Sequence, residues 1–196
     1  MNNINRTESK IFENKQIKRE NLLSSAYTLF VRKGLNDTSI SDITDNAGVA
    51  KGTFYLYFKD KCDIYEKAVI EKTRLLFDEA FIDTNNKNII KFPDKLINMI
   101  DYIINSLTEN IELTKFINKN LSLGFYSNVE DIYNIKDTIT QELKEYNKKI
   151  KEPNVTLYMI IELVSSSCYN SIINNIPMSI NDYKPIMFNE IKKIIN

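Results

Sequence analysis

The sequence contains no histidine, and this absence excludes more functions than any other feature of its composition. Histidine is the side chain that changes charge near neutral pH, so acid–base chemistry, metal ligation and Ser–His or Cys–His nucleophiles that depend on it are excluded. The two cysteines, Cys62 and Cys168, lie too far apart in the sequence to form a zinc cluster. We therefore expect no enzyme, no metal site and no cofactor.

Long hydrophobic runs and an excess of one charge are also missing. No run reaches the roughly 18 apolar residues that a membrane span needs, and the charged first twenty residues do not resemble a secretory signal. Lys and Arg number 26, as do Asp and Glu, so the formal net charge is zero. This balance argues against a histone-like or ribosomal role. We expect a cytoplasmic globular protein without a membrane partner.

Glycine and proline are scarce, with four of each among 196 residues. Gly34, Gly48 and Gly52 lie close together, and all four prolines come later. A chain this poor in both residues favours long helices joined by short loops. We therefore predict an all-α fold of about nine helices.

The first third of the chain has the pattern of a helix-turn-helix. Apolar residues at helical spacing predict a helix from about residue 14 to 33, ended by Gly34. Two short helices are predicted over residues 39–46 and 51–58, with a tight turn at Gly48 between them. Ser39 and Asp42 have the spacing of a capping box. A longer helix followed by two short ones around such a turn is typical of this motif.

The start of the second short helix has the chemistry of a base-reading turn. In a helix-turn-helix this turn enters the major groove and must be narrow. Lys51 can donate to guanine, and Thr53 offers a hydroxyl and a methyl group. Gly52 costs about 1 kcal/mol relative to Ala in a helix, and close approach of the backbone to DNA is one reason for it. A three-helix cluster without DNA also needs a tight turn, so the spacing alone leaves both interpretations open.

Charge is unevenly distributed along the chain. Residues 1–61 hold ten Lys and Arg against seven Asp and Glu, which gives +3, and residues 62–196 hold sixteen against nineteen, which gives −3. A positive N-terminal segment is consistent with DNA binding, although chance alone can produce a difference of this size.

Beyond this spacing, the residues resemble the DNA-binding head of TetR-family transcriptional regulators. The resemblance rests on Ala26–Gly34 (AYTLFVRKG), Thr38–Ile43 (TSISDI), Ala47–Phe58 (AGVAKGTFYLYF) and Lys61. It covers roughly residues 20–70, and the length and helical character of the remainder are also similar to that family. The resemblance implies a homodimer that binds a palindromic operator in double-stranded DNA. It also implies a repressor that a small-molecule effector, bound in the C-terminal domain, releases from DNA.

The resemblance assigns DNA contacts by position. Thr38 and Ser39 are expected to cap the second helix and contact phosphate, and Lys51, Gly52 and Thr53 to read base edges. Tyr55 and Tyr57 are expected to contact the DNA backbone, and Lys61 to contact phosphate at the fourth helix. Leu56 completes the set of expected DNA-binding residues. Leu56 can only touch a thymine methyl group or pack. Ala50 departs from the Ser that many members have, and Thr44 replaces a common Ala. We expect Phe54 and Phe58 in the core.

The predicted domains are a flexible arm (1–15), the helix-turn-helix domain (16–61) and a ligand-binding and dimerisation domain (62–196). Further helices are predicted over residues 61–83, 93–109, 112–121, 129–151, 154–175 and 182–195. The last two of these are the dimer surface by resemblance. Their expected apolar faces consist of Tyr158, Ile161, Val164, Cys168, Ile172, Ile186, Phe188, Ile191, Ile194 and Ile195.

The effector pocket is expected among the central helices of the C-terminal domain. Aromatic and Met side chains at helical spacing are its candidates: Phe77, Phe81, Met99, Tyr102, Ile103, Phe116, Phe125, Tyr126, Tyr133, Tyr158 and Met159. Few charges fall at buried positions, which favours an apolar effector. Two alternatives remain open. One is an architectural DNA-binding protein with a filled core and no effector, and the other is a protein-interaction module with a vestigial head.

Overall fold

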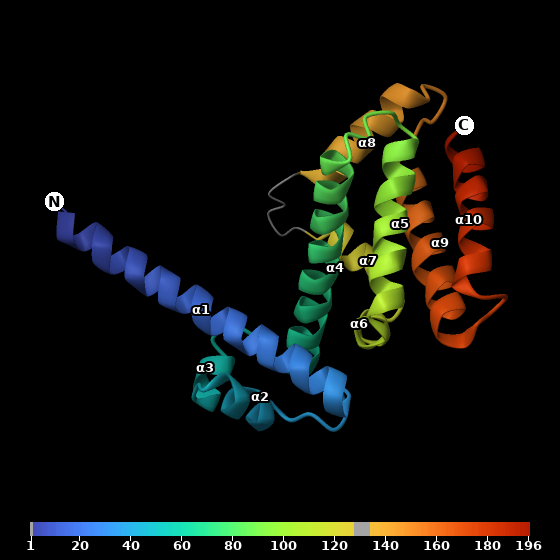
Figure 1. Ribbon diagram of the computed structural model, residues 1–196. Helices are drawn as coiled ribbons and strands as arrows, with labels where there is room; N and C mark the ends of the chain where they lie inside the picture. Colours follow the sequence, from blue (N-terminus) through green and yellow to red (C-terminus); the bar gives the residue numbers. More distant parts are fainter. Residues whose placement is uncertain (1, 128–133) are drawn as a thin grey trace. The chain divides into compact units, whose positions relative to one another are not determined.

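The computed structural model describes residues 2–127 and 134–196, and over these residues every regular element is an α-helix (Figure 1). Ten helices, α1 to α10, follow one another along this part of the chain. The all-α prediction is confirmed. The chain forms two compact units, Met1–Ala68 and Val69–Asn196, and the boundary between them falls inside a helix rather than at residue 61.

The N-terminal unit contains α1 (Asn2–Lys33), α2 (Ile40–Ala47), α3 (Lys51–Phe54) and the first turns of α4 (Lys61–Asn86). Its core is the apolar stripe of α1 packed against α2, α3 and the start of α4. The buried residues are Leu22, Leu23, Ala26, Leu29, Phe30, Ile43, Phe54, Phe58, Ile64 and Ala68. Burying each large side chain contributes about 1.5–3 kcal/mol to stability. This cluster therefore holds α2, α3 and the first turns of α4 against α1.

Helix α1 is longer than the sequence predicted. Residues 1–15 were expected to form a flexible arm, but α1 begins at Asn2. No glycine or proline interrupts residues 2–33. Once the buried turns around Leu22 have nucleated the helix, each added residue gains a hydrogen bond at little further cost.

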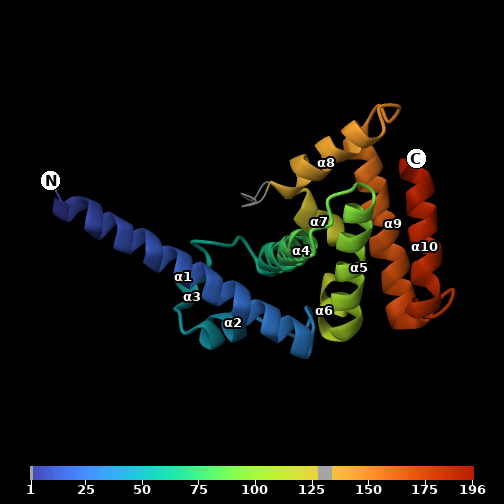
Figure 2. The ribbon, with the colours of Figure 1, turned by 45° about the horizontal axis from the view of Figure 1, so that its top comes forward.

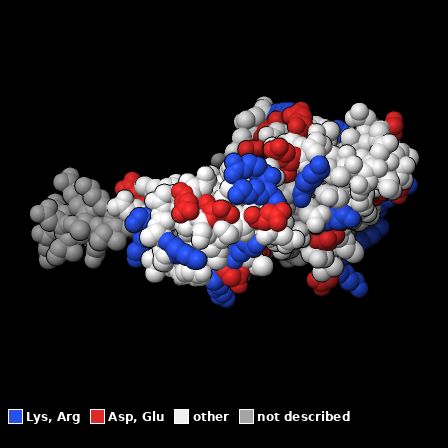
Figure 3. Space-filling model, turned by 90° about the horizontal axis from the view of Figure 1, so that it is seen from below, with Lys and Arg blue, Asp and Glu red and all other residues white. Residues whose placement is uncertain are grey.

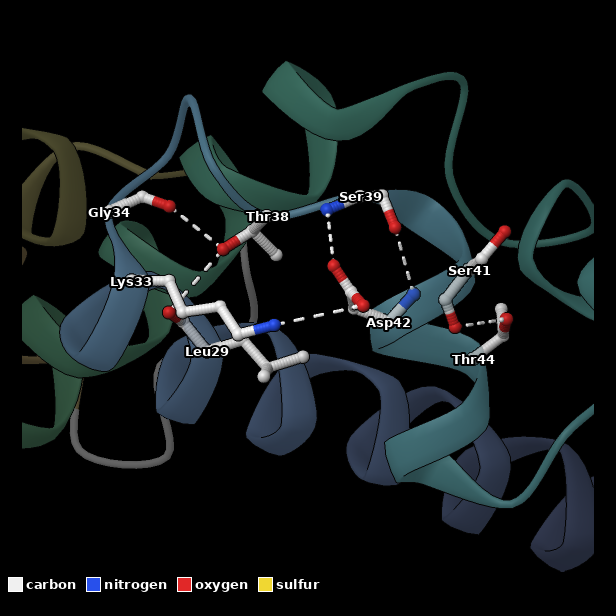
Figure 4. A network of polar contacts seen from close by, with 8 residues as sticks. All are labelled: Leu29, Lys33, Gly34, Thr38, Ser39, Ser41, Asp42 and Thr44. Atoms are coloured by element: carbon white, nitrogen blue, oxygen red, sulfur yellow. Dashed lines mark hydrogen bonds and ion pairs between the residues drawn. The ribbon is translucent and has the colours of Figure 1, made fainter.

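Helix α2 begins and ends as predicted (Figure 4). The Asp42 N–H donates to Ser39 Oγ at 3.0 Å, and the Ser39 N–H donates to Asp42 Oδ2 at 2.9 Å, which completes the capping box. Gly48 ends the helix at φ 66°, in the left-handed region that favours glycine. These local signals fix the tight turn between α2 and α3.

Two predicted helices differ from the structure. The third helix was expected over residues 51–58, but α3 ends at Phe54, and residues 55–57 form a turn that returns the Phe58 N–H to the Phe54 carbonyl at 3.0 Å. The predicted helix over residues 112–121 is broken into α6 (Ile111–Ile117) and α7 (Leu121–Phe125). Asn118 at φ 49° separates them, because left-handed backbone cannot continue an α-helix.

The C-terminal unit is built around α9 (Pro153–Asn174), which contacts α5 (Asp94–Glu109), α6, α7, α8 (Ile135–Tyr146) and α10 (Ile180–Ile195). Figures 1 and 2 both show α5, α9 and α10 side by side. The inward face of α9 carries Leu157, Ile160, Ile161, Val164 and Cys168. Its neighbours bury their own apolar faces against this stripe.

Polar contacts link the helices around this core. The amide of Asn98 on α5 donates to Thr84 Oγ1 on α4 at 2.8 Å. Lys95 Nζ lies 2.6 Å from Glu142 Oε1 on α8. Among the described residues, no helix combines the length and apolar composition that crossing a bilayer requires.

The capping box makes the stability of the head depend on pH. Hydrogen bonds from the Ser39 N–H and hydroxyl, with the nearby Lys33 ammonium, hold the pKa of Asp42 below its ordinary 3.8. A carboxyl whose pKa is lower in the folded state contributes stability above the unfolded value, and this contribution is lost as pH falls through the folded value.

We therefore expect Asp42→Asn to lower the free energy of unfolding at neutral pH and to have little effect well below pH 3.8. Urea unfolding of the full chain, followed by far-UV circular dichroism at several pH values, measures this difference. A difference between the two proteins that stays constant across this range would contradict the assignment.

Candidate functional site

Helix α3 and the turn after it present polar and apolar side chains to solvent. Lys51 and Gly52 are exposed, and Thr53 is half-buried. In the turn, Tyr55 is 55% exposed and Leu56 is 79% exposed, whereas Phe54 and Phe58 are buried as predicted. The core therefore anchors this segment through its two phenylalanines and leaves the residues between them on the surface.

Gly52 is not required by close packing or by a left-handed backbone. A Cβ built on it meets nothing within 4 Å, and its backbone is not in the left-handed region. Neither packing nor conformation therefore requires glycine here, although glycine costs about 1 kcal/mol in a helix. Ala50, the residue before α3, provides no side-chain cap.

Thr38 was predicted to contact DNA, and the structure places it elsewhere (Figure 4). It is 1% exposed, and its hydroxyl lies 2.8 Å from the Gly34 carbonyl and 3.4 Å from the Leu29 carbonyl. The Gly34 carbonyl directly follows α1 and has no partner within that helix. Thr38 therefore caps α1 from inside the core.

Ser39 and Lys61 lie at the beginnings of α2 and α4. Ser39 is exposed, and its hydroxyl oxygen accepts the Asp42 N–H. The Lys61 ammonium donates to the Asn36 carbonyl at 3.1 Å. An ammonium has three donors, so two remain for a phosphate.

Acidic groups lie among these lysines. Burial raises the pKa of Asp63, but hydrogen bonds from the Lys67 ammonium and the Lys59 N–H outweigh it, so the pKa lies below the ordinary 3.8. Asp63 is therefore charged at neutral pH and neutralises part of the positive charge near Lys61. Figure 3 shows positive and negative side chains interspersed, without one continuous basic field.

The C-terminal unit contains two adjoining cavities. The inner cavity, of about 30 Å³, is lined entirely by apolar residues: Phe77, Leu96, Met99, Ile100, Ile103, Leu121, Phe125, Ile139, Leu157, Ile160, Ile161 and Val164. It has about the volume of one water molecule, and its lining offers water no hydrogen-bonding partner.

The outer cavity, of about 220 Å³, has a mostly polar lining. Its described lining residues are Arg74, Phe77, Asp78, Gly124, Phe125, Ser127, Asn134, Ile135, Lys136 and Asp137. Phe77 and Phe125 line both cavities, and their ring centroids lie 4.9 Å apart. This ring pair therefore forms part of the wall of both cavities.

The structure brings part of the predicted pocket together. Phe77, Met99, Ile103 and Phe125 line the inner cavity. The described residues that do not line either cavity are Phe81, Tyr102, Phe116, Tyr126, Tyr158 and Met159, and Tyr133 lies outside the described residues.

The misplaced residues have other surroundings. Phe81 lies under the Lys95 ammonium at 5.3 Å, and the Tyr126 hydroxyl donates to the Asn154 carbonyl at 2.9 Å. Tyr102 lies 3.4 Å from Glu79, and Phe116 is buried away from the cavities. Tyr158 and Met159 are exposed on α9.

The predicted dimer surface is wrong for its buried members. Ile161, Val164, Cys168, Ile191 and Ile195 are buried inside the chain, so they cannot supply a surface for a partner. Cys168 packs against Met187 with the sulfurs 3.6 Å apart, and burial raises the pKa of its thiol to about 12. Ile172 and Phe188 are half-buried. Tyr158, Ile186 and Ile194 are exposed.

Sequence reasoning missed several cavity residues. Leu96 and Ile100 lie one turn from Met99 and Ile103, so helical periodicity could have found them. The polar residues Arg74 and Lys136 come from separate helices and carry no sequence signal. Within the described residues, no group of three His, Cys, Asp or Glu side chains is placed to hold a metal ion.

Comparison with known proteins agrees with this geometry. The profile of the family "Bacterial regulatory proteins, tetR family" matches residues 22–68. The uncharacterized HTH-type transcriptional regulator YdgC of Bacillus subtilis is 27% identical over 130 residues, which span 65% of this chain and 62% of YdgC. The HTH-type transcriptional repressor BepR of Brucella suis is 33% identical over 64 residues, which span 33% of this chain and 30% of BepR. The chain thus covers less than two thirds of each relative.

The fold matches solved structures over most of its length. The transcriptional regulator FadR from Bacillus subtilis, solved in complex with stearoyl-CoA, superimposes with a TM-score of 0.59 and 17% identity, covering 90% of this chain and 97% of FadR. At this identity the match shows the fold alone. The family match shows that residues 22–68 carry the helix-turn-helix of the tetR family of bacterial regulatory proteins.

Proposed function

We propose that the protein is a repressor that binds a palindromic operator as a homodimer and leaves it when a small effector with an apolar part binds the C-terminal unit. The observation that carries this proposal is the surface of α3 and its following turn. There, Gly52 faces open space and Leu56 is almost fully exposed, although neither choice helps the fold.

Each exposed residue of this surface has a DNA partner that suits its chemistry. The Lys51 ammonium suits guanine, Leu56 suits a thymine methyl group, and Gly52 lets the backbone approach the bases closely. Ser39, Tyr55, Tyr57 and Lys61 supply donors for phosphates, which fix the register of the head. In a dimer, two such heads would read half-sites about one DNA turn, roughly 34 Å, apart.

Selection of DNA fragments from the source genome by the purified full chain, near physiological salt, tests operator reading. We expect the native protein to enrich a palindrome, and the variant Tyr55→Ala with Lys61→Ala to lose it. Lys148→Gln removes an exposed lysine of the C-terminal unit and should leave the enrichment unchanged. Weak binding that fades with salt and shows no preferred sequence would count against the proposal.

Gly52→Ala separates stability from DNA binding. Because its Cβ meets open space, alanine should stabilise the head by up to about 1 kcal/mol through helix propensity. At the DNA surface the added methyl group should reduce operator affinity by about tenfold or more, which is about 1.4 kcal/mol.

Thermal unfolding and operator titration of the same preparations measure both effects. Thr38→Val is the matched control, because loss of its buried hydroxyl should lower stability by about 1–3 kcal/mol and leave the affinity of the folded protein unchanged. Full operator affinity in Gly52→Ala would show that the backbone does not approach DNA here.

The homodimer is supported by apolar side chains on the outward face of α9. Val155, Met159 and Leu163 are exposed at helical spacing, with Met159 at 53%. Ile186 and Ile194 on the adjacent α10 are also exposed. Apolar residues clustered on neighbouring helices are typical of a surface that a partner covers.

We expect the native protein to sediment at twice the 22.9 kDa of one chain, and Met159→Glu to sediment as a monomer, because a buried unpaired carboxylate opposes association. Glu190→Gln on α10 is a mild control at an exposed position and should stay dimeric. A native protein that is monomeric at micromolar concentration would contradict this part of the proposal.

The small inner cavity favours a second candidate function, an architectural DNA-binding protein without an effector. An effector much larger than one water molecule cannot enter this space unless side chains move. The outer cavity, by contrast, has room for a small polar group. Release of the operator by a ligand that binds the C-terminal unit distinguishes a repressor from the architectural protein.

A further inference from the structure

We propose that one end of the C-terminal unit binds the surface of an anionic lipid bilayer. This end, the basic tip, consists of the loop between α4 and α5 (residues 87–93) and the last residue of α8 with the loop that follows it (residues 146–152). Ile90 enters the lipid, and lysines of both loops contact its phosphate groups. Binding at the basic tip depends on neither operator reading nor an effector.

An aromatic pair brings the two loops together. The rings of Phe92 and Tyr146 have their centroids 5.4 Å apart. The Asn147 amide donates to the Ile195 carbonyl at 3.1 Å, which ties the second loop to the end of α10. Figures 1 and 2 both show the α4–α5 loop, the α8–α9 loop and the end of α10 at the same end of the unit. The basic tip is therefore one surface.

The basic tip is positive within a unit that is otherwise negative. Residues 69–196 hold fifteen Lys and Arg against seventeen Asp and Glu, which gives −2. The loops over residues 87–93 and 147–152 hold five Lys against one Glu, which gives +4, so the rest of the unit carries −6. Positive charge gathered at one end of a negative unit suits an anionic partner.

Most of these lysines have no partner within the chain. Lys87 is the exception, because its ammonium lies 2.7 Å from Asp83. The other four are exposed, and within residues 2–127 and 134–196 their ammonium groups have no ion pair and no hydrogen bond: Lys91, Lys148, Lys149 and Lys151. Their charge is therefore available to a partner.

At 86%, Ile90 is the most exposed of the large apolar side chains that the structure describes. The loop is held on both sides of it. The Ile89 N–H donates to the Thr84 carbonyl at 3.3 Å, and the Phe92 ring packs against Tyr146. A single exposed apolar side chain is ordinary, but this one shares a surface with four unpaired lysines. That combination suits a partner that is anionic and also accepts an apolar side chain.

The composition of the basic tip favours lipid over other anionic partners. Protein–protein interfaces are enriched in Arg and depleted in Lys, and the two loops contain five lysines and no arginine. Nucleic acid phosphates would contact the lysines and leave Ile90 in water. An anionic bilayer attracts lysines to its surface and accepts apolar side chains at the level of its headgroups. The expectation of no membrane partner rested on the lack of a spanning segment, and binding at the surface requires none.

Sedimentation of the full chain with lipid vesicles tests this binding. One set of vesicles contains equal parts of phosphatidylglycerol and phosphatidylcholine, and the other contains phosphatidylcholine alone. We expect the protein to sediment with the anionic vesicles only, and less so as salt is added. Inorganic phosphate at the same phosphate concentration should not release it, because a free ion offers no place for Ile90. No binding to the anionic vesicles, or equal binding to both sets, would overturn the proposal.

Paired lysine variants locate the surface. Lys148→Gln with Lys149→Gln should weaken binding to anionic vesicles by on the order of tenfold or more, because each lysine near such a surface contributes about fivefold. An unchanged Tm would show that this variant is folded.

Two control pairs remove the same charge elsewhere. Lys115→Gln with Lys119→Gln changes two exposed lysines of the same unit, and Lys51→Gln with Lys61→Gln changes two lysines of the head. Both pairs should keep native binding to the vesicles. An equal loss in either control would show that the basic tip is not the lipid-binding surface.

Tryptophan can report whether Ile90 enters the lipid, because the chain has none of its own. Emission from Ile90→Trp should move to shorter wavelength when anionic vesicles are added. Ile176→Trp, at a 61% exposed position between α9 and α10, should show no shift. Sedimentation of Ile90→Trp with the vesicles without a shift would overturn the entry of Ile90 into lipid. These measurements need no DNA, so their outcome is separate from that of the proposed function.

Discussion

Helix α4 is the element on which the rest of the structure depends, because it runs unbroken from Lys61 to Asn86 and belongs to both compact units. Its first turns bury Ile64 and Ala68 in the head, and its later turns bury Leu76, Phe77 and Ala80 in the C-terminal unit. No glycine or proline interrupts it, so its hydrogen-bond ladder has no point at which it would bend easily.

The head could be predicted from the sequence because its signals are local. Gly34, Gly48 and the pair of Ser39 with Asp42 each act over a few residues, and the structure has each of them at the predicted boundary. Thr38 shows the limit of such reasoning. Its partner carbonyl at Leu29 lies nine positions away, and the sequence gives no sign that the loop folds the hydroxyl back onto the end of α1.

The C-terminal unit was less predictable because its helices are apolar on more than one side. Periodicity marks Val155, Met159 and Val164 as members of one helix, but it does not reveal that Val164 faces the core while the other two face solvent. A preference for aromatic residues also misled the choice of pocket residues. The inner cavity is lined mostly by aliphatic side chains, with Phe77 and Phe125 at its boundary.

The size of the inner cavity also bears on the direction of regulation. A cavity of about 30 Å³ holds about one water molecule, and in the same state the backbone of α7 touches α4 at Gly124. A larger ligand must spend part of its binding energy on moving the lining side chains, and its apparent affinity falls by the fraction of molecules in which the cavity is open.

Coupling between the effector site and the DNA-binding site would be reciprocal: an effector that lowers the affinity for DNA is itself bound more weakly, by the same factor, when DNA is bound. An effector shifts the equilibrium only by its preference for the open state. If the closed state is the one that holds the operator, the resting protein is a repressor, and the effector releases it. An activator would require the opposite order, with DNA binding assigned to the open state.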